Sequence, residues 1–316
     1  MTKVAPVSIV IPMRNESKSL ALLLDGLEKQ TLLPSEIIFV DTGSTDQSID
    51  IVNSWWKLKG WQHGTCLVFI KEGAFPGLAR NIGITHVTSQ WIAFIDAGIV
   101  PDDDWLNALY QHVIQHGTTG VFGTCRFTGT STIKKALCAL SYGYNAIHPV
   151  LPSSIFHKKV FQIVGMFRSD LRSAEDIVWK EKFIDIYKHS NVCHKAIVHY
   201  NSFPDSILLA VKKWFVYGFN TIKAGVMKRQ QIMYIIVFMI IVVSFIYHTQ
   251  LGMVITIAYT IFRGILVPIL KSKLLYWWKG NFNAFIITIP LGIILDLSKT
   301  IGFLTGYVAK IHMAKK

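Results

Sequence analysis

The sequence predicts an α/β fold, in which a doubly wound, mainly parallel (Rossmann-like) sheet is followed by interfacial and transmembrane helices. Two observations support this prediction. Within about 100 residues, short β-branched or aromatic runs alternate four times with stretches of helical periodicity, which is the order of a parallel sheet covered by helices. After residue 231, long apolar segments carry little or no charge, as is typical of helices that cross a membrane.

The predicted strands are short apolar runs, a composition typical of buried parallel strands. They lie at residues 7–12, 36–41, 66–72 and 91–96. Three intervening helices are predicted on separate grounds. Leucines at helical spacing indicate one over 17–30, the capping-box spacing of Ser44 and Gln47 indicates the next, and a glycine-led segment over 77–87 indicates the third.

The charge is distributed very unevenly along the chain. Residues 1–205 hold 19 basic and 18 acidic side chains, whereas residues 206–316 hold 13 basic side chains and one acid, Asp296. The basic excess therefore flanks the apolar segments, as positive charge flanks membrane helices, and nucleic acid is not expected as a partner. A hydrophobic content of 51% excludes intrinsic disorder and argues against a wholly soluble protein.

The four cysteines show neither CxxC spacing nor a disulfide framework. We expect free thiols in a reducing compartment. The apolar run near the N-terminus is too short for a signal peptide, so the polar part of the chain is expected in the cytoplasm.

Polar groups follow three of the predicted strands. Pro12 with the turn after it, Asp41 and Asp96 each stand where a strand ends. Because ligands of such sheets bind beyond the carboxyl ends of the strands, these groups outline a polar cleft suited to a nucleotide.

Five segments together resemble family 2 glycosyltransferases with the GT-A fold. Four resemble the nucleotide-binding half of that family and one its acceptor half: SIVIPMRNES, EIIFVDTGSTDQS, GLARNIGI and WIAFIDAGIVPDDDWL, then VFQIVGMFRSDLRSAEDIVWKEKF. The resemblance covers residues 5–205, about two thirds of the chain. It implies sugar transfer with inversion from a nucleotide sugar of the UDP or GDP type.

The resemblance also assigns the donor-binding residues. Asp41 is expected to accept a hydrogen bond from the imide N–H of a uracil-like base flanked by Pro12, since an ionised carboxylate only accepts. Arg80 and Asn81 are expected at the diphosphate, where a guanidinium fork and a helix N-terminus both favour negative charge. Glu16 either reaches the base or ribose or is a solvated first-turn acid.

A divalent cation, Mg²⁺ or Mn²⁺, is implied by the same resemblance. Asp96 holds the first position of the family's Asp-x-Asp motif, but here the sequence reads Asp96-Ala97-Gly98 and lacks the second carboxylate. Donor diphosphate and water can complete the coordination, with His199 as a further ligand. Alternatively His199 is a strand-end histidine, and Arg80 with a helix N-terminus neutralises the diphosphate.

The adjacent acids Glu175 and Asp176 are expected on the acceptor side. By resemblance, Asp176 is the base that takes the proton of the attacking hydroxyl. Glu175 points elsewhere and supports the loop. Trp179 either stacks on a sugar face or packs in the core.

The last third of the chain contains an expected interfacial helix and several candidate spans. Residues 214–231 have the makeup of an interfacial helix, 232–248 form the first span, and 251–270 form a second that Arg263 and Pro268 break. The two spans form a hairpin, and the basic residues before and after it place its open end on the cytoplasmic side. Residues 282–310, interrupted by Asp296 and Lys299, form either a third span or a re-entrant pair of helices.

These patterns divide the chain into three parts: a catalytic domain over 1–205, an interfacial linker over 206–231 and a membrane region over 232–316. The predicted function is a membrane-anchored glycosyltransferase acting on a lipid-linked acceptor, in surface polysaccharide or glycolipid assembly. The expected location is the inner or plasma membrane, with several crossings and a cytoplasmic catalytic domain. The alternative is a catalytically impaired, membrane-tethered scaffold that binds nucleotide sugars.

Overall fold

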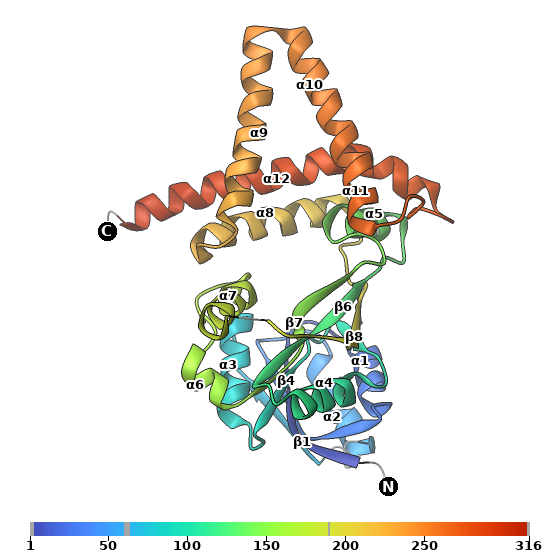
Figure 1. Ribbon diagram of the computed structural model, residues 1–316, viewed down its shortest axis with the longest axis vertical. Coiled ribbons are helices and arrows are strands. Elements are labelled where there is room, and N and C mark those ends of the chain that lie inside the picture. The colour runs from blue at the N-terminus through green and yellow to red at the C-terminus, as the bar shows by residue number, and fades with distance from the viewer. Residues whose placement is uncertain (1–2, 60–63, 189, 315–316) are drawn as a thin grey trace. The chain divides into compact units, whose positions relative to one another are not determined.

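The computed structural model describes residues 3–59, 64–188 and 190–314, and the chain divides into two units (Figure 1). The first comprises Met1–Arg126 with Ile147–Tyr200, and the second comprises Phe127–Ala146 with Asn201–Lys316. Phe127–Ala146 therefore leaves the first unit between two strands and returns to it, an excursion that the predicted boundary at residue 205 does not include. The four cysteines are free, and all lie within the described residues.

The first unit contains a mixed sheet with the order β3-β2-β1-β4-β7-β6-β8-β5. Its strands are β1 (Lys3–Met13), β2 (Leu32–Asp41), β3 (Thr65–Ile70), β4 (Trp91–Phe94), β5 (Ile99–Pro101), β6 (Gly120–Phe127), β7 (Ile147–His157) and β8 (Val192–Tyr200). β3, β2, β1 and β4 are parallel, which confirms the predicted α/β class. The remaining half of the sheet includes the antiparallel pairs β4–β7, β6–β7 and β5–β8, which the sequence patterns do not predict.

Helices cover this sheet. They are α1 (Leu20–Glu28), α2 (Ser48–Lys59), α3 (Pro76–His86), α4 (Trp105–His116), α6 (Lys159–Val164) and α7 (Glu175–Tyr187). Figure 1 shows α3, α6 and α7 gathered at one side of the sheet. The core there is a buried cluster in which aromatic rings of β4, β7 and α7, among them Phe94, Phe156 and Phe183, pack with aliphatic side chains. Gly83 lets α3 approach β1, because a Cβ at this position would lie 2.4 Å from Cγ1 of Val10.

The strand order also locates a crevice. The chain runs from β1 outward to β2 and β3, then returns to the opposite side of β1 to form β4. The carboxyl ends of β1 and β4 therefore flank a topological switch point, where open α/β sheets bind ligands. Pro12 on β1 and Asp96, just after β4, are on this edge, and Asp41 ends β2 beside them.

The second unit is helical. It contains α5 (Thr132–Ser141), α8 (Ile207–Ala224), α9 (Lys228–Tyr247), α10 (Thr249–Ile261), a π-helical turn (Phe262–Leu266), α11 (Val267–Ser272) and α12 (Phe282–Ala314). Three helical segments among the described residues are long and apolar enough to cross a membrane: Lys228–Tyr247, Thr249–Ser272 and Phe282–His312. The second of these is not broken at Pro268 as predicted. It continues through the π-helical turn, and such turns absorb local disruption of a helix.

Candidate active site

The loops after β1 and β2 are joined by hydrogen bonds. The backbone N–H of Asn15 donates to Oγ of Ser44 at 2.9 Å, and the N–H of Thr45 donates to Oδ1 of Asn15 at 2.8 Å. The N–H of Glu16 donates to Oγ of Ser48 at 2.8 Å. Asn15 adopts a left-handed conformation, with φ 55°, which asparagine tolerates better than most residues. These contacts fix Glu16 next to the end of β2, a constraint that no local sequence pattern reveals.

Asp41 lies at the predicted edge and is fully buried. Its Oδ1 accepts hydrogen bonds from the N–H groups of Gly43 and Ser44, both at 2.8 Å, and its Oδ2 accepts one from Oγ of Ser44 at 2.5 Å. Gly43 has a φ of 96°, which the turn requires. A carboxylate has about four acceptor positions, and the turn occupies three of those on Asp41.

Arg80 brings two other predicted site residues together. Its Nη1 donates to Oε1 of Glu175 at 2.6 Å, and its Nη2 donates to Oδ1 of Asp96 at 2.8 Å. The Arg80 and Glu175 side chains are only 3% and 6% exposed, while Asp96 is 36% exposed. Burial alone lowers the pKa of Arg80, but the charges of Asp96 and Glu175 outweigh it and raise the pKa, so the guanidinium stays charged. Arg80 therefore links α3 to the end of β4 and the start of α7.

Asp176 follows Glu175 in the first turn of α7 and is half-buried. Its Oδ1 accepts a hydrogen bond from the N–H of Ile177 at 2.9 Å. Removal from water, followed by the negative charge of Glu175, raises the pKa of Asp176 to about 6, while the positive charge of Arg80 opposes this rise. A carboxyl group with a pKa near 6 is suited to accept a proton close to neutral pH.

Asn81 is engaged by the segment that precedes α7. Its Nδ2 donates to the carbonyl oxygen of Phe167 at 2.8 Å, and its Oδ1 accepts from the N–H of the same residue at 2.9 Å. Gly77 permits this close approach, because a Cβ there would lie 2.2 Å from the carbonyl oxygen of Arg168. The two ends of the Asn81 amide thus bind protein backbone rather than facing a diphosphate, which corrects the predicted placement.

Trp179 packs in the core and is 1% exposed. Its Nε1 donates to the carbonyl oxygen of Gly165 at 2.9 Å, and its ring stacks on Phe167 and Phe161 with centroids 5.1 and 5.3 Å away. Of the two predicted roles, only packing fits this geometry. Stacking on an acceptor sugar is wrong, because the aromatic cluster already covers the ring and the carbonyl oxygen of Gly165 binds its N–H.

His199 lies on β8 opposite Val100 of β5. Its Nε2 is 2.6 Å from Oδ1 of Asp102, so its nearest acidic partner is this residue and not the predicted metal ligand Asp96. Among residues 3–59, 64–188 and 190–314, no group of three or more His, Cys, Asp or Glu side chains could hold a metal ion. The described side chains therefore do not form a metal centre by themselves.

Comparison with known proteins places this chain in a family. The sequence model described as "Glycosyl transferase family 2" matches residues 8–172. Glycosyltransferase AglE of Haloferax volcanii is 25% identical over 243 residues, which cover 72% of this chain and 77% of AglE. Glycosyltransferase GlyG of Streptococcus pneumoniae serotype 4 is 30% identical over 118 residues, 37% of this chain and 38% of GlyG. The chain thus matches well under two thirds of the length of some relatives.

A solved structure has a similar fold. The mannosyltransferase PcManGT from Pyrobaculum calidifontis, determined with GDP-Man and Mn²⁺, superimposes with a TM-score of 0.54 at 13% identity. The superposition covers 98% of this chain and 88% of PcManGT. At this level of identity, the similarity concerns the fold.

Proposed function

Because this chain belongs to glycosyl transferase family 2, we propose that it transfers a sugar from a nucleotide-diphosphate sugar to an acceptor, with inversion at the anomeric carbon. The observation that carries this proposal is the Glu175-Asp176 pair at the start of α7, held by Arg80 beside the switch point of the sheet. There a cation, a strand-end acid and a carboxyl group with a raised pKa meet.

The proposed donor is a UDP or GDP sugar bound at the carboxyl edge of β1, β2 and β4. Asp41 is the proposed acceptor for the ring N–H that both uracil and guanine present. Pro12 flanks the base, Glu16 lies near the base or ribose, and Asp96 faces the ribose and diphosphate. The complex of PcManGT with GDP-Man supports a donor of this class.

Asp176 is the proposed base. Glu175 is held in a buried ion pair 2.6 Å long, so its carboxylate is occupied, whereas Asp176 makes no ion pair among the described residues. Asp176 takes the proton of an acceptor hydroxyl while the hydroxyl oxygen bonds to the anomeric carbon and the nucleoside diphosphate leaves from the opposite face. A phosphate acceptor is already ionised near neutral pH and does not need this base.

The proposal includes a divalent cation only as a companion of the donor. Since the described side chains form no metal centre, Mg²⁺ or Mn²⁺ would be held by Asp96 and by diphosphate oxygens. When bound, it would neutralise charge on the leaving diphosphate. The step assigned to Asp176 does not pass through it.

The proposed acceptor is lipid-linked. The second unit carries three helical segments suited to a membrane and a large excess of basic residues, both of which support attachment to the inner or plasma membrane through several crossings. The positive-inside rule supports a cytoplasmic location for the open end of the α9–α10 hairpin, and the proposed location of the first unit is the same face.

A second candidate is a binding protein without catalysis. The missing second acid after Asp96 favours it. Donor hydrolysis and calorimetric donor binding, measured on wild type and Asp176→Asn, separate the two. Loss of a general base costs about 10²–10⁴-fold in rate while binding stays unchanged.

The matched control for this experiment is Asp170→Asn, which removes an exposed carboxylate paired with Arg168. The control should keep wild-type turnover. Donor binding without turnover in the wild type would favour the binding protein, and equal turnover in all three proteins would reject Asp176 as the base.

A further inference from the structure

The long helix α12 crosses the open end of the α9–α10 hairpin (Figure 1). It meets α9 at the first two turns of that helix, where Oη of Tyr307 donates to Oε1 of Gln231 at 2.9 Å. One turn farther along α9, the rings of Phe303 and Tyr234 lie 6.1 Å apart. These contacts are near the start of α9, not along its length.

The contacts of α12 with the second arm of the hairpin lie at the end of α10 and in the π-helical turn that follows it. Arg263 donates from Nε and Nη2 to the two carboxylate oxygens of Asp296, at 2.6 and 3.0 Å, and Oη of Tyr259 donates to Oδ2 at 2.7 Å. Gly264 brings the two backbones together, since a Cβ there would lie 2.5 Å from Cα of Ile289. Asp296 and Arg263, two of the three charges that interrupt the predicted spans, therefore neutralise each other at this crossing.

Along its second half, α12 packs side by side with α8. Ser298, Gly302 and Gly306 recur every four residues, the spacing that lets two helices approach closely. Oγ of Ser298 donates to the carbonyl oxygen of Val211 at 2.6 Å. A Cβ at Gly302 would lie 2.4 Å from the carbonyl oxygen of Phe215. This face of α12 is therefore fixed to α8, whose Lys212 and Lys223 are exposed.

The level of the crossing can be worked out along α9. This helix starts with Lys228 and Arg229, and α12 contacts it at Gln231 and Tyr234. At 1.5 Å per residue, α12 lies about 5–9 Å beyond the basic residues, which is the depth of helices that lie in a membrane interface. The helix continues for about 20 Å to Tyr247, so its whole length matches a hydrocarbon core of about 30 Å.

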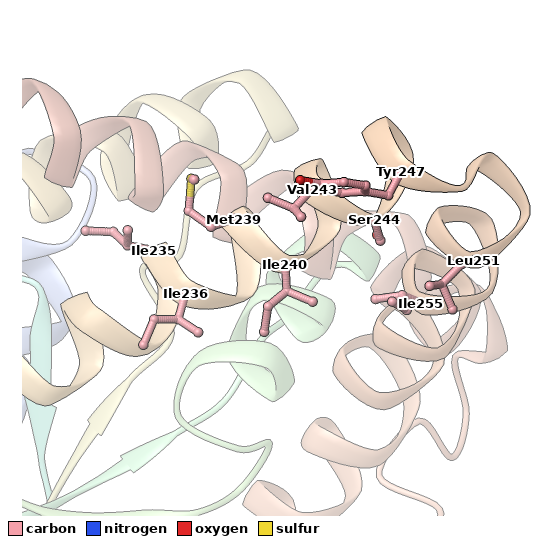
Figure 2. A pocket seen from close by; sticks show the side chains of 9 residues that line it. All are labelled: Ile235, Ile236, Met239, Ile240, Val243, Ser244, Tyr247, Leu251 and Ile255. Atoms are coloured by element: carbon pink, nitrogen blue, oxygen red, sulfur yellow. The ribbon is translucent and has the colours of Figure 1, made fainter.

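The surfaces beyond the crossing are apolar and exposed. Between α9 and α10 lies an open groove of about 510 Å³ (Figure 2). Its lining side chains are Ile235, Ile236, Met239, Ile240, Val243, Ser244, Tyr247, Leu251 and Ile255. On α12, a stripe opposite α8 is also exposed and apolar, formed by Ile286, Leu297, Ile301, Leu304 and Val308. Both surfaces are suited to acyl chains.

We propose that α12 does not cross the membrane but lies in its plane, and that α9 with α10 forms a hairpin that crosses it and returns. The partner of the α8–α12 pair is a lipid leaflet with anionic headgroups, which the exposed lysines of α8 and the basic start of α9 contact. Lys310, near the end of α12, then lies on the same side of the bilayer as Lys228. This inference rests on the proposed membrane attachment but is independent of sugar transfer.

Cysteine labelling in sealed vesicles tests this arrangement. Lys228→Cys, Thr249→Cys and Lys310→Cys are made one at a time in the full chain carrying Cys66→Ser, since the other three cysteines are buried. A membrane-impermeant maleimide is added to vesicles of either orientation, and the parent chain gives the background. We expect positions 228 and 310 to react from one side and position 249 from the other.

Reaction of position 310 from the side that labels position 249 would overturn the proposal, because α12 would then cross the bilayer. The labelling pattern does not depend on whether the protein transfers sugar. A failure of this proposal can therefore be told apart from a failure of the proposed activity. A thermal midpoint equal to that of the parent chain serves as the check that each variant is folded.

Discussion

Removal of the Arg80 side chain should destabilise the first unit strongly. Arg80→Met keeps an unbranched chain but leaves the Glu175 carboxylate, 6% exposed, without its partner at 2.6 Å. Removing one member of a buried ion pair costs about 3–5 kcal/mol, because the remaining charge stays buried and uncompensated. The second contact, to the 36% exposed Asp96, adds little, since water screens it.

The measurement is denaturant unfolding of the full chain in detergent at neutral pH, followed by tryptophan fluorescence, since Trp179 lies in the core of the first unit. The matched control is Arg168→Met. It removes an arginine whose ion pair with Asp170 is 2.7 Å long but whose partners are 36% and 48% exposed. An exposed pair contributes about 0–1 kcal/mol, so the control should unfold close to wild type.

The loss of stability in Arg80→Met should also depend on pH. Asp176 has a pKa of about 6 in the folded chain, above that of an unfolded aspartate, so the folding free energy it contributes is present at low pH and is lost as pH rises through 6. Arg80 lowers the pKa of Asp176, so the variant should shift the acid limb of any base-dependent rate to higher pH and lose more stability at pH 8 than at pH 5. Unfolding within about 1 kcal/mol of the Arg168→Met control, with no change in pH dependence, would refute the assigned role of Arg80.

Three further outcomes are expected. Asp41→Ala should weaken calorimetric binding of UDP or GDP by about 1.5–3 kcal/mol, while Ser44→Ala, which removes the bonds of its Oγ with Asp41 and Asn15 but leaves the carboxylate, should weaken it less; equal affinities would reject Asp41 as a base contact. EDTA should abolish sugar transfer and Mg²⁺ or Mn²⁺ should restore it, but not in Asp96→Ala; full activity in EDTA would exclude the metal. Gly302→Leu should separate α12 from α8 and lower the thermal midpoint of the second unit, whereas Ile301→Leu on the exposed stripe should not; identical midpoints would contradict the close packing.

The sequence by itself determined the elements of the parallel half of the sheet and their order. The apolar runs at 7–12 and 36–41 became β1 and β2, and the leucines at helical spacing became α1, because hydrophobic periodicity acts through neighbours that are close along the chain. The same local logic put Asp41 and Asp96 at strand ends and identified the apolar helices of the last third.

Only the tertiary structure decided which side chains meet. Arg80 and Glu175 are 95 residues apart, and no local pattern says that the arginine binds this acid rather than a diphosphate. His199 paired with Asp102 for the same reason, since the antiparallel pairing of β5 with β8 brings them together.

The sequence also left the location of amphipathic and apolar residues undetermined. The sequence allows Trp179 either to stack on a sugar face or to pack in the core. The aromatic cluster around it shows that it packs in the core. Residues 282–312 have the length and hydropathy of a span, but hydropathy does not specify whether a helix crosses the membrane or lies in its plane. The course of α12 across the hairpin was fixed by contacts that sequence spacing cannot supply, namely the small residues packed against α8 and the Asp296–Arg263 pair, because both depend on chain segments brought together only by folding.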